Sequence, residues 1–347
     1  MNNENPVNAE RKKHGGLLKK GSPKDYKSKQ KVCFAALWIT VIIVFLMVII
    51  TAWNRKTDRN DKSSMDNNEA VSNRSEENLT EDKNEVDIEK LIREGNSIRL
   101  AEIFDKQRQI NETTDYNALD NTLYAWWFKR NDAHERSGCQ EDFDISEYNA
   151  FYTIPVSEKR MYITFDCGYE NGFTADILDT LKEENVTAAF FVTQTFIRDN
   201  VDLVKRMKEE GHLVCNHTVT HPSMPSKSVE DQQKEILSCE NYMKEATGYG
   251  MDLFFRPPRG EYSKRTLQIA KDLGYTTIFW SMAYLDYDVN NQPSSEHVIE
   301  HFSKYHHPGA VPLLHNVSKA NHDALRIVLQ NLKNEGYSFG NLYELKG

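Results

Sequence analysis

The second half of the chain alternates short apolar runs with longer stretches of helical periodicity. We interpret the apolar runs as β-strands at residues 161–165, 188–192, 212–215, 253–255, 275–280, 310–314 and 338–342. Between them, apolar residues three or four positions apart predict helices over 173–184, 199–210, 228–246, 263–272, 295–305 and 319–335. Strands that alternate with helices form parallel sheets. The pattern therefore predicts an α/β domain over residues 160–347.

The number of repeats and the placement of polar residues favour a barrel. About seven strand–helix repeats fit a compact, distorted (β/α) barrel, whereas a doubly wound sheet is the alternative. No Gly-rich phosphate loop supports that alternative. Polar groups follow five of the predicted strands, namely Asp166, His217, Arg256, Ser281 and His315. Barrel enzymes collect their catalytic groups at such strand ends.

A long uncharged segment precedes this domain. Residues 32–53 contain no charged side chain, and about 20 apolar residues span a bilayer as a helix. A buried core helix is one alternative, and a cleaved signal peptide with an apolar core of about 7–15 residues is another. The run is longer than such a core and leads directly into Arg55 and Lys56. We therefore predict an uncleaved, single-pass transmembrane anchor.

Charge is distributed unevenly about this segment. Residues 1–31 hold nine Lys or Arg and three acids, a net of +6, so the remainder of a chain with net charge −9 carries −15. The positive-inside rule places 1–31 in the cytoplasm as a basic tail and the rest of the chain outside. An acidic body argues against a nucleic-acid partner. Nothing indicates oligomerisation, so a monomer is expected.

The remaining segments are simpler. Residues 54–87 lack the apolar side chains needed to offset chain entropy, which predicts a disordered linker. Residues 88–159 are interpreted as an N-terminal extension that packs on the catalytic domain, with weak helical spacing over 88–115. The five cysteines show no zinc-ribbon or CxxC spacing, and no disulfide is predicted from them.

Four motifs carry candidate chemistry. Asp166 follows an apolar strand, where a lone Asp is usually a turn or cap residue. His217 and His221 are four apart, so on one helical turn they would share a face and could bind one metal ion, although surface His pairs are common at that spacing. Arg256 begins Arg-Pro-Pro-Arg-Gly, whose prolines would hold the guanidinium in place. His315 ends an apolar strand, where a lone His is more often structural.

Together these motifs resemble the polysaccharide deacetylase family. Its strand-end Asp motif, paired His, Arg-x-Pro-x-Gly turn, Trp-Ser segment and Leu-x-Leu-His-like end all have counterparts, in order, across 160–345. Residues 148–152, 168–172, 256–260 and 290–292 look in particular like the delta-lactam-biosynthetic de-N-acetylases of spore-forming bacteria. Residues 120–159 resemble the N-terminal extension of that subfamily.

The resemblance implies a fold and a chemistry. The family fold is a distorted (β/α) barrel, in agreement with the periodicity. Asp166 would be the general base, His315 the general acid, and Arg256 the partner that keeps Asp166 ionised. His217 and His221 would bind a divalent metal ion that polarises the acetyl carbonyl. The substrate would be N-acetylmuramic acid in peptidoglycan strands that lack the stem peptide, as for lactam formation in spore cortex.

The sequence also departs from the family pattern. Cys167 stands where the family has a metal-binding Asp. A thiolate with two imidazoles would suit zinc, whereas the alternative is a space-filling Cys with a weak or absent metal. Ala283 replaces the first acid of the Trp-Ser segment, so a carboxylate that could tune His315 is expected to be missing. Arg259 stands where many relatives have an aromatic residue and could bind a lactyl carboxylate, unless it is merely solvated.

Three functions remain open at this point. The first is the muramic de-N-acetylase, whose substrate-binding residues are expected to be Tyr169, Arg259, Trp280 and Asp286. The second is a de-N-acetylase of N-acetylglucosamine in peptidoglycan or a chitin-like glycan, with the same catalytic residues. The third is a wall-glycan-binding module that has lost its metal. Retention of a complete base and acid set argues against the third.

Overall fold

The computed structural model describes residues 86–140 and 142–346. The predicted basic tail (1–31), the transmembrane anchor (32–53) and nearly all of the linker (54–87) lie outside these ranges, so they stay predictions. Within the described ranges, no helix combines the length and the apolar character that a membrane span requires.

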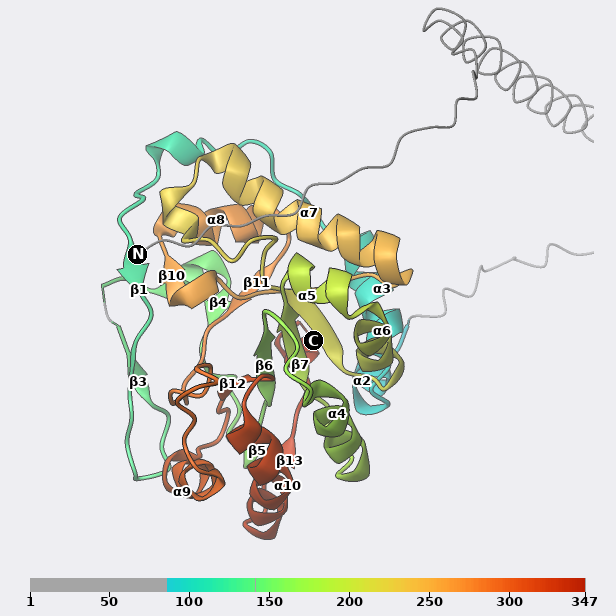
Figure 1. Ribbon diagram of the computed structural model, residues 1–347. Helices are drawn as coiled ribbons and strands as arrows, with labels where there is room; N and C mark the ends of the chain where they lie inside the picture. The colour runs from blue at the N-terminus through green and yellow to red at the C-terminus, as the bar shows by residue number, and fades with distance from the viewer. Residues whose placement is uncertain (1–85, 141, 347) are drawn as a thin grey trace, which may run out of the picture. The chain divides into compact units, whose positions relative to one another are not determined.

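A seven-stranded parallel sheet forms the centre of the domain (Figure 1). Its spatial order is β12 (Leu313–His315), β6 (Thr164–Cys167), β7 (Ala189–Val192), β8 (Leu213–Asn216), β9 (Asp252–Phe255), β11 (Thr276–Ile278) and β4 (Ala150–Phe151). From β6 to β11 the spatial order follows the chain, and β12 returns beside β6. A doubly wound sheet would instead reverse its order at a switch point. The arrangement fits the predicted distorted barrel.

The sheet curves through half a barrel and is not closed by a regular ladder. Among the described residues, β12 and β4 are edge strands, and isolated bridges such as Thr153–Ala310 and Met282–Pro312 lie near the open side. The predicted seventh strand at 338–342 is only partly correct. β13 (Ser338–Phe339) pairs with β5 (Arg160–Met161) in a separate sheet, and β4 takes the seventh place.

Amphipathic helices cover the sheet, as Figure 1 shows. They are α4 (Thr174–Glu183), α5 (Gln194–Asp199), α6 (Val201–Glu209), α7 (Val229–Thr247), α8 (Lys264–Asp272), α9 (Ser295–Tyr305) and α10 (Lys319–Asn334). Serines at positions 228, 263, 294 and 318 cap four of these helices, which explains where they begin. The sequence predicted all of these helices except α5, a short helix whose N-cap is Thr193. Its six residues are too few to show a clear helical period.

The N-terminal extension contributes elements to the catalytic body. It contains α2 (Ile88–Arg93), α3 (Ser97–Gln107), η1 (Tyr116–Ala118), β1 (Tyr124–Ala125), β2 (Phe128–Lys129), β3 (Gly138–Cys139), η2 (Ile145–Tyr148) and β4. β1 pairs with β10 (Glu261–Tyr262), and β2 pairs with β3. Three further 3-10 turns complete the fold, namely η3 (Met224–Ser226), η4 (Pro258–Gly260) and η5 (Leu342–Leu345). Because β4 belongs to the main sheet, the extension is part of the scaffold that positions the site.

A buried ion pair joins this extension to the sheet. The Lys208 ammonium lies 2.7 Å from an Asp252 carboxylate oxygen, and both side chains are fully buried. Lys208 also donates to the Ser97 carbonyl, while Asp252 accepts from the Val214 amide and the Tyr343 hydroxyl. Buried charges are tolerated only when such partners satisfy them. The network therefore ties α3, α6, two strands and η5 together.

Candidate active site

A pocket of about 880 Å³ opens beside the C-terminal ends of the central strands. Seven of the predicted site residues line it: Asp166, Tyr169, His217, His221, Arg259, Trp280 and His315. Asp166 and His315 lie directly opposite each other in the register of β6 and β12. Successive strand ends thus bring together side chains far apart in sequence, as expected for a barrel.

Asp166 is paired with a buried arginine. Arg256 is 0% exposed, and its Nη1 donates to Asp166 Oδ1 at 2.7 Å. Its other nitrogens donate to the carbonyls of Ile278 and Phe279, which fix the guanidinium plane. Burial alone would raise the pKa of Asp166, but the positive charges of Arg256 and of protonated His315 lower it below its ordinary value. Asp166 is therefore held as a carboxylate.

His315 is paired with a buried carboxylate. Its Nδ1 lies 2.7 Å from Asp286 Oδ1, and its backbone amide donates to Asp286 Oδ2. Because a carboxylate accepts, Nδ1 carries a proton and Nε2 is the atom left for the pocket. Burial would lower the pKa of His315, but Asp286 and Asp166 raise it above its ordinary value. His315 is thus favoured in its protonated form.

Asp286 therefore has a different place from the one expected. It was predicted to contact substrate, and a carboxylate to tune His315 was expected to be missing. The second expectation is wrong, because Asp286 supplies that carboxylate. Asp286 is 1% exposed, and Asn321 Nδ2 also donates to it at 2.7 Å. Tyr284 in turn donates to Asn321. Sequence reasoning missed this chain of support, since Asn321 lies on α10 outside every motif and Tyr284 was given no role within the Trp-Ser segment.

The paired histidines lie on a loop. The residues after β8 are not helical, and Thr218 and His221 have positive φ, so the expected helical turn is wrong. The loop is braced by Glu235 of α7, which accepts from the amides of Val219 and Thr220. The two imidazole rings nevertheless meet, with centroids 4.9 Å apart. The braced loop therefore brings the two imidazoles together, as the predicted helical turn was expected to do.

Both imidazoles are neutral at physiological pH. His217 Nδ1 lies 2.8 Å from the Arg256 carbonyl, which can only accept, so its Nε2 has a lone pair. That Nε2 lies 3.5 Å from Asp166 Oδ2. Burial lowers the pKa of His217 and lowers that of His221 to about 4. Neutral imidazoles of this kind are available as metal ligands.

The predicted zinc set is not assembled. Cys167 is 0% exposed and belongs to the apolar cluster beneath the helices, together with Phe165 and Phe196. Burial raises its pKa well above its ordinary value, so the thiol stays protonated, whereas a zinc ligand must be a thiolate. In the described part of the chain, no three His, Cys, Asp or Glu side chains are grouped to hold a metal ion. A catalytic zinc site normally has three protein ligands, so Cys167, His217 and His221 do not form the predicted set.

The loop after β6 is held against the loop after β12. Glu170 accepts from the amides of Gly172 and Thr174, and Asn171 donates to the Val317 carbonyl. Asn316 donates to the Tyr169 carbonyl. These bonds explain the Gly-Tyr-Glu-Asn-Gly motif as a brace between the two strand ends that carry Asp166 and His315.

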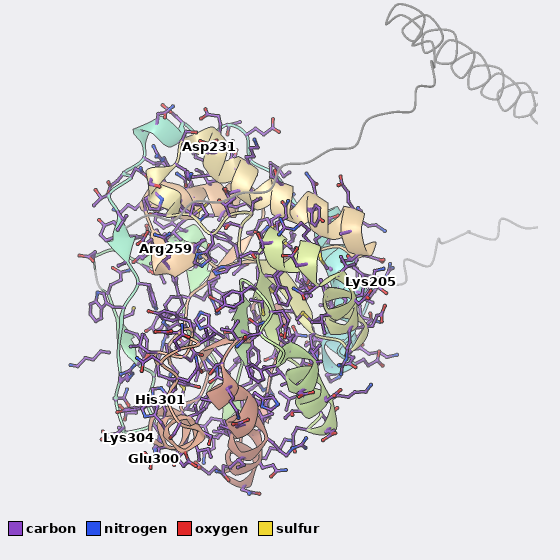
Figure 2. The ribbon with its side chains drawn as sticks, viewed as in Figure 1. Lys205, Asp231, Arg259, Glu300, His301 and Lys304 are labelled. Carbon is purple, nitrogen blue, oxygen red and sulfur yellow. The ribbon has the colours of Figure 1, made fainter. Side chains whose placement is uncertain are left out.

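Arg259, labelled in Figure 2, is one of the residues that line the pocket. Its φ of 59° places it in the left-handed region. At the following Gly260 a Cβ would lie 2.8 Å from the Trp280 ring, so the turn is tightly constrained. The Arg259 side chain is exposed and forms no ion pair with any described residue. Its position agrees with the predicted substrate-binding role, which stays a prediction.

Apolar side chains complete the pocket. Tyr169 and Tyr287 are about half exposed, and Leu285 is 71% exposed. Trp280 lies deeper, where its carbonyl accepts from Trp126 of the extension at 2.9 Å. An amphipathic ligand with a ring-shaped apolar face suits this lining. Arg130, also from the extension, lines the same pocket and was not found from the sequence.

An ionised carboxylate opposite a protonated imidazole, in a pocket at the ends of parallel strands, defines an acid–base hydrolase. The family model described as polysaccharide deacetylase matches residues 153–278. The peptidoglycan-N-acetylmuramic acid deacetylase PdaA of Bacillus subtilis is 42% identical over 230 residues, which cover 66% of this chain and 88% of that protein. The chain belongs to the polysaccharide deacetylase family, which confirms the resemblance.

Comparison with solved structures agrees with this family assignment. The structure of Bacillus subtilis PdaA, a family 4 carbohydrate esterase, superposes with a TM-score of 0.64 at 40% identity, covering 66% of this chain and 98% of that one. A family 4 carbohydrate esterase from Bacillus anthracis gives 0.55 at 37% identity, with the same coverage. The peptidoglycan-N-acetylglucosamine deacetylase PgdA of Listeria monocytogenes is 35% identical over 191 residues, 55% of this chain and 40% of that protein.

The role of Asp286 is testable through the pH profile. If protonated His315 is the acid, kcat/KM falls as pH rises through the His315 pKa. Asp286→Asn removes the charge that raises this pKa, so the alkaline limb should move to lower pH. Asp288→Asn, an exposed acid two residues away, is the control and should leave the limb in place. An unchanged limb in folded Asp286→Asn would show that Asp286 does not tune His315.

Proposed function

We propose that this chain hydrolyses the N-acetyl group of N-acetylmuramic acid in peptidoglycan strands without stem peptides, as for muramic delta-lactam formation in spore cortex. The observation that carries the proposal is the pair of opposed dyads, Asp166–Arg256 and His315–Asp286, in one pocket of a polysaccharide deacetylase. The similarity to a muramic acid deacetylase supports the choice of sugar.

The two dyads supply an acid and a base in the required protonation states. Asp166 accepts a proton from water, whose oxygen attacks the acetyl carbonyl carbon. Oδ1 is held by Arg256, so Oδ2 is the oxygen that takes the proton. His315 Nε2 then gives its proton to the amide nitrogen as the C–N bond breaks. The products are acetate and a free amine on the sugar.

Arg259 supports muramic acid over glucosamine. Without a stem peptide, the lactyl group ends in a free carboxylate, which a guanidinium can bind in bidentate fashion. With the peptide attached, that charge becomes an amide and added bulk must be housed. The chain beyond residue 31 carries −15, so an anionic glycan needs a local cation in the pocket.

Two other functions remain as alternatives. A glucosamine de-N-acetylase would use the same acid and base, and the similarity to PgdA favours it as the second candidate. A binding module without catalysis has less support, because such a module needs neither the ionised Asp166 nor the protonated His315.

The substrate is tested by comparing glycan strands. Wild type and Arg259→Gly are incubated with peptide-stripped and peptide-bearing strands, and free amines are counted on each sugar. Glycine suits the positive φ at this position, so the variant removes the charge without straining the turn. Wild type should deacetylate stripped muramic residues, and Arg259→Gly should lose about 1.5–3 kcal/mol on these only, as for a charged hydrogen bond.

Asp166→Asn is the inactive control for this comparison. Lacking the base, it should be slower by about 100- to 10,000-fold on every substrate. Free amines mainly on glucosamine, or equal action on peptide-bearing strands, would overturn the muramic assignment. The deacetylase assignment would remain.

Zinc stays a prediction that rests on His217 and His221. With Cys167 turned into the core, the described residues offer these two imidazoles together and no third ligand of the expected kind. The zinc content of the full chain should fall in His221→Ala and stay constant in Cys167→Ser. If wild type and His221→Ala contain equal zinc, the His pair is not the zinc site.

We also propose that residues 32–53 anchor the protein with its catalytic domain outside the cytoplasmic membrane. The uncharged run and its basic flank support this topology, and the wall substrate requires it. Protease added to intact cells should release the catalytic domain. A domain that resists the protease until the cells are lysed would contradict the topology.

A further inference from the structure

The pocket contains a second cation that no sequence motif indicated. Arg130 lies directly after β2 of the N-terminal extension and lines the pocket together with Arg259. Its Nη2 donates to the Ala283 carbonyl at 2.5 Å. Its guanidinium carbon lies 5.6 Å from the Phe128 ring centroid and 5.8 Å from that of Tyr305. These contacts place the guanidinium while leaving most of its N–H donors unused.

No carboxylate of the described residues compensates the charge of Arg130. Arg130 is exposed and has no carboxylate partner among the described residues. Arg130 contacts the backbone carbonyl of Ala283, whose side chain carries no charge. The one acid that lines the pocket, Asp166, is already paired with Arg256. The remaining ionic groups of the lining, apart from the imidazoles, are Arg130 and Arg259, both positive.

Two unpaired arginines are unexpected in a strongly acidic chain. Outside the first 31 residues the net charge is −15, so chance placement favours acids. A guanidinium fork matches a carboxylate in bidentate geometry. The pocket volume of about 880 Å³ is near the upper end of the roughly 300–1,000 Å³ that holds a drug-sized ligand, so it has room for more than one sugar.

We propose that Arg130 is a second carboxylate-binding residue of the substrate cleft, which selects glycan strands carrying free lactyl carboxylates. The inference rests on the proposed function and deepens it. Arg259 and Arg130 are supplied by different parts of the chain, the turn after β9 and the extension. The extension thus contributes to specificity as well as to the sheet. The carboxylate at Arg130 belongs either to the reacting sugar or to a second stripped muramic residue of the same strand.

Kinetics of full-length variants test the proposal. The probes are peptide-stripped strand fragments with one or two muramic residues, and the same fragments with their lactyl carboxylates converted to neutral methylamides. Arg130→Gln should raise KM for the free carboxylates by about 10- to 100-fold, as for a lost charged hydrogen bond, with kcat nearly unchanged. Arg130→Lys should recover part of this loss, because it keeps the charge without the fork.

The controls separate charge recognition from structure. Lys129→Gln removes the same charge from the neighbouring exposed position and should leave KM unchanged. Methylamide fragments should not distinguish Arg130→Gln from wild type. A loss confined to fragments with two muramic residues places the carboxylate on the second sugar, and a loss with both fragments places it on the reacting sugar. Unchanged KM, or an equal loss on methylamides, would overturn the proposal.

A binding arm keeps this test independent of the reaction. Asp166→Asn, with and without Arg130→Gln, is titrated with carboxylate and methylamide fragments by calorimetry. Arg130→Gln should weaken carboxylate binding by the same factor and leave methylamide binding unchanged. If wild type deacetylates glucosamine alone, the proposed function fails, and this arm still decides the role of Arg130. Equal carboxylate affinity with and without Arg130 would refute it.

Discussion

The rest of the site depends on the buried contact between Arg256 and Asp166. A fully buried guanidinium is costly unless it is paired and hydrogen-bonded, and here one carboxylate and two strand-end carbonyls accept from its three nitrogens. The same contact keeps Asp166 ionised in a pocket that would otherwise favour its neutral form. The Arg256 carbonyl also sets the tautomer of His217. One residue thus fixes the state of the base and of its neighbour.

The acid is built on the same principle with the signs reversed. Asp286 is buried, accepts from the ring and the backbone of His315, and is held by Asn321. Burial by itself would lower the pKa of the imidazole, and the adjacent negative charge raises it above its ordinary value. Because β6 and β12 are adjacent and in register, the two dyads face one pocket. The parallel pairing of β6 and β12 therefore places the ionised base and the protonated acid side by side in one site.

Much of this arrangement could be predicted from the sequence, because it depends on periodicity. Strand ends occur where apolar runs stop, so Asp166, Arg256 and His315 were found as neighbours. The partner of His315 was not found in this way, because Asp286 lies in an irregular segment between β11 and α9. Cys167 is the instructive error. Asp166 lines the pocket, whereas Cys167, the next and last residue of β6, is buried in the apolar cluster with Phe165, in agreement with the alternation of side chains along a strand. The prediction of a metal ligand rested on the family motif, which has a polar Asp where this chain has an apolar Cys.

The protonation state of His315 tests the central claim most directly. Nitrogen-15 NMR of histidine-labelled protein, titrated with pH and assigned with His315→Ala, reports the pKa of this ring without substrate or turnover. The opposed dyads predict a pKa above the ordinary value of about 6.5. They also predict that Nδ1 retains its proton when the ring becomes neutral, because that proton is donated to Asp286. A pKa at or below the ordinary value, or a neutral ring protonated on Nε2, would contradict the assignment of His315 as the acid.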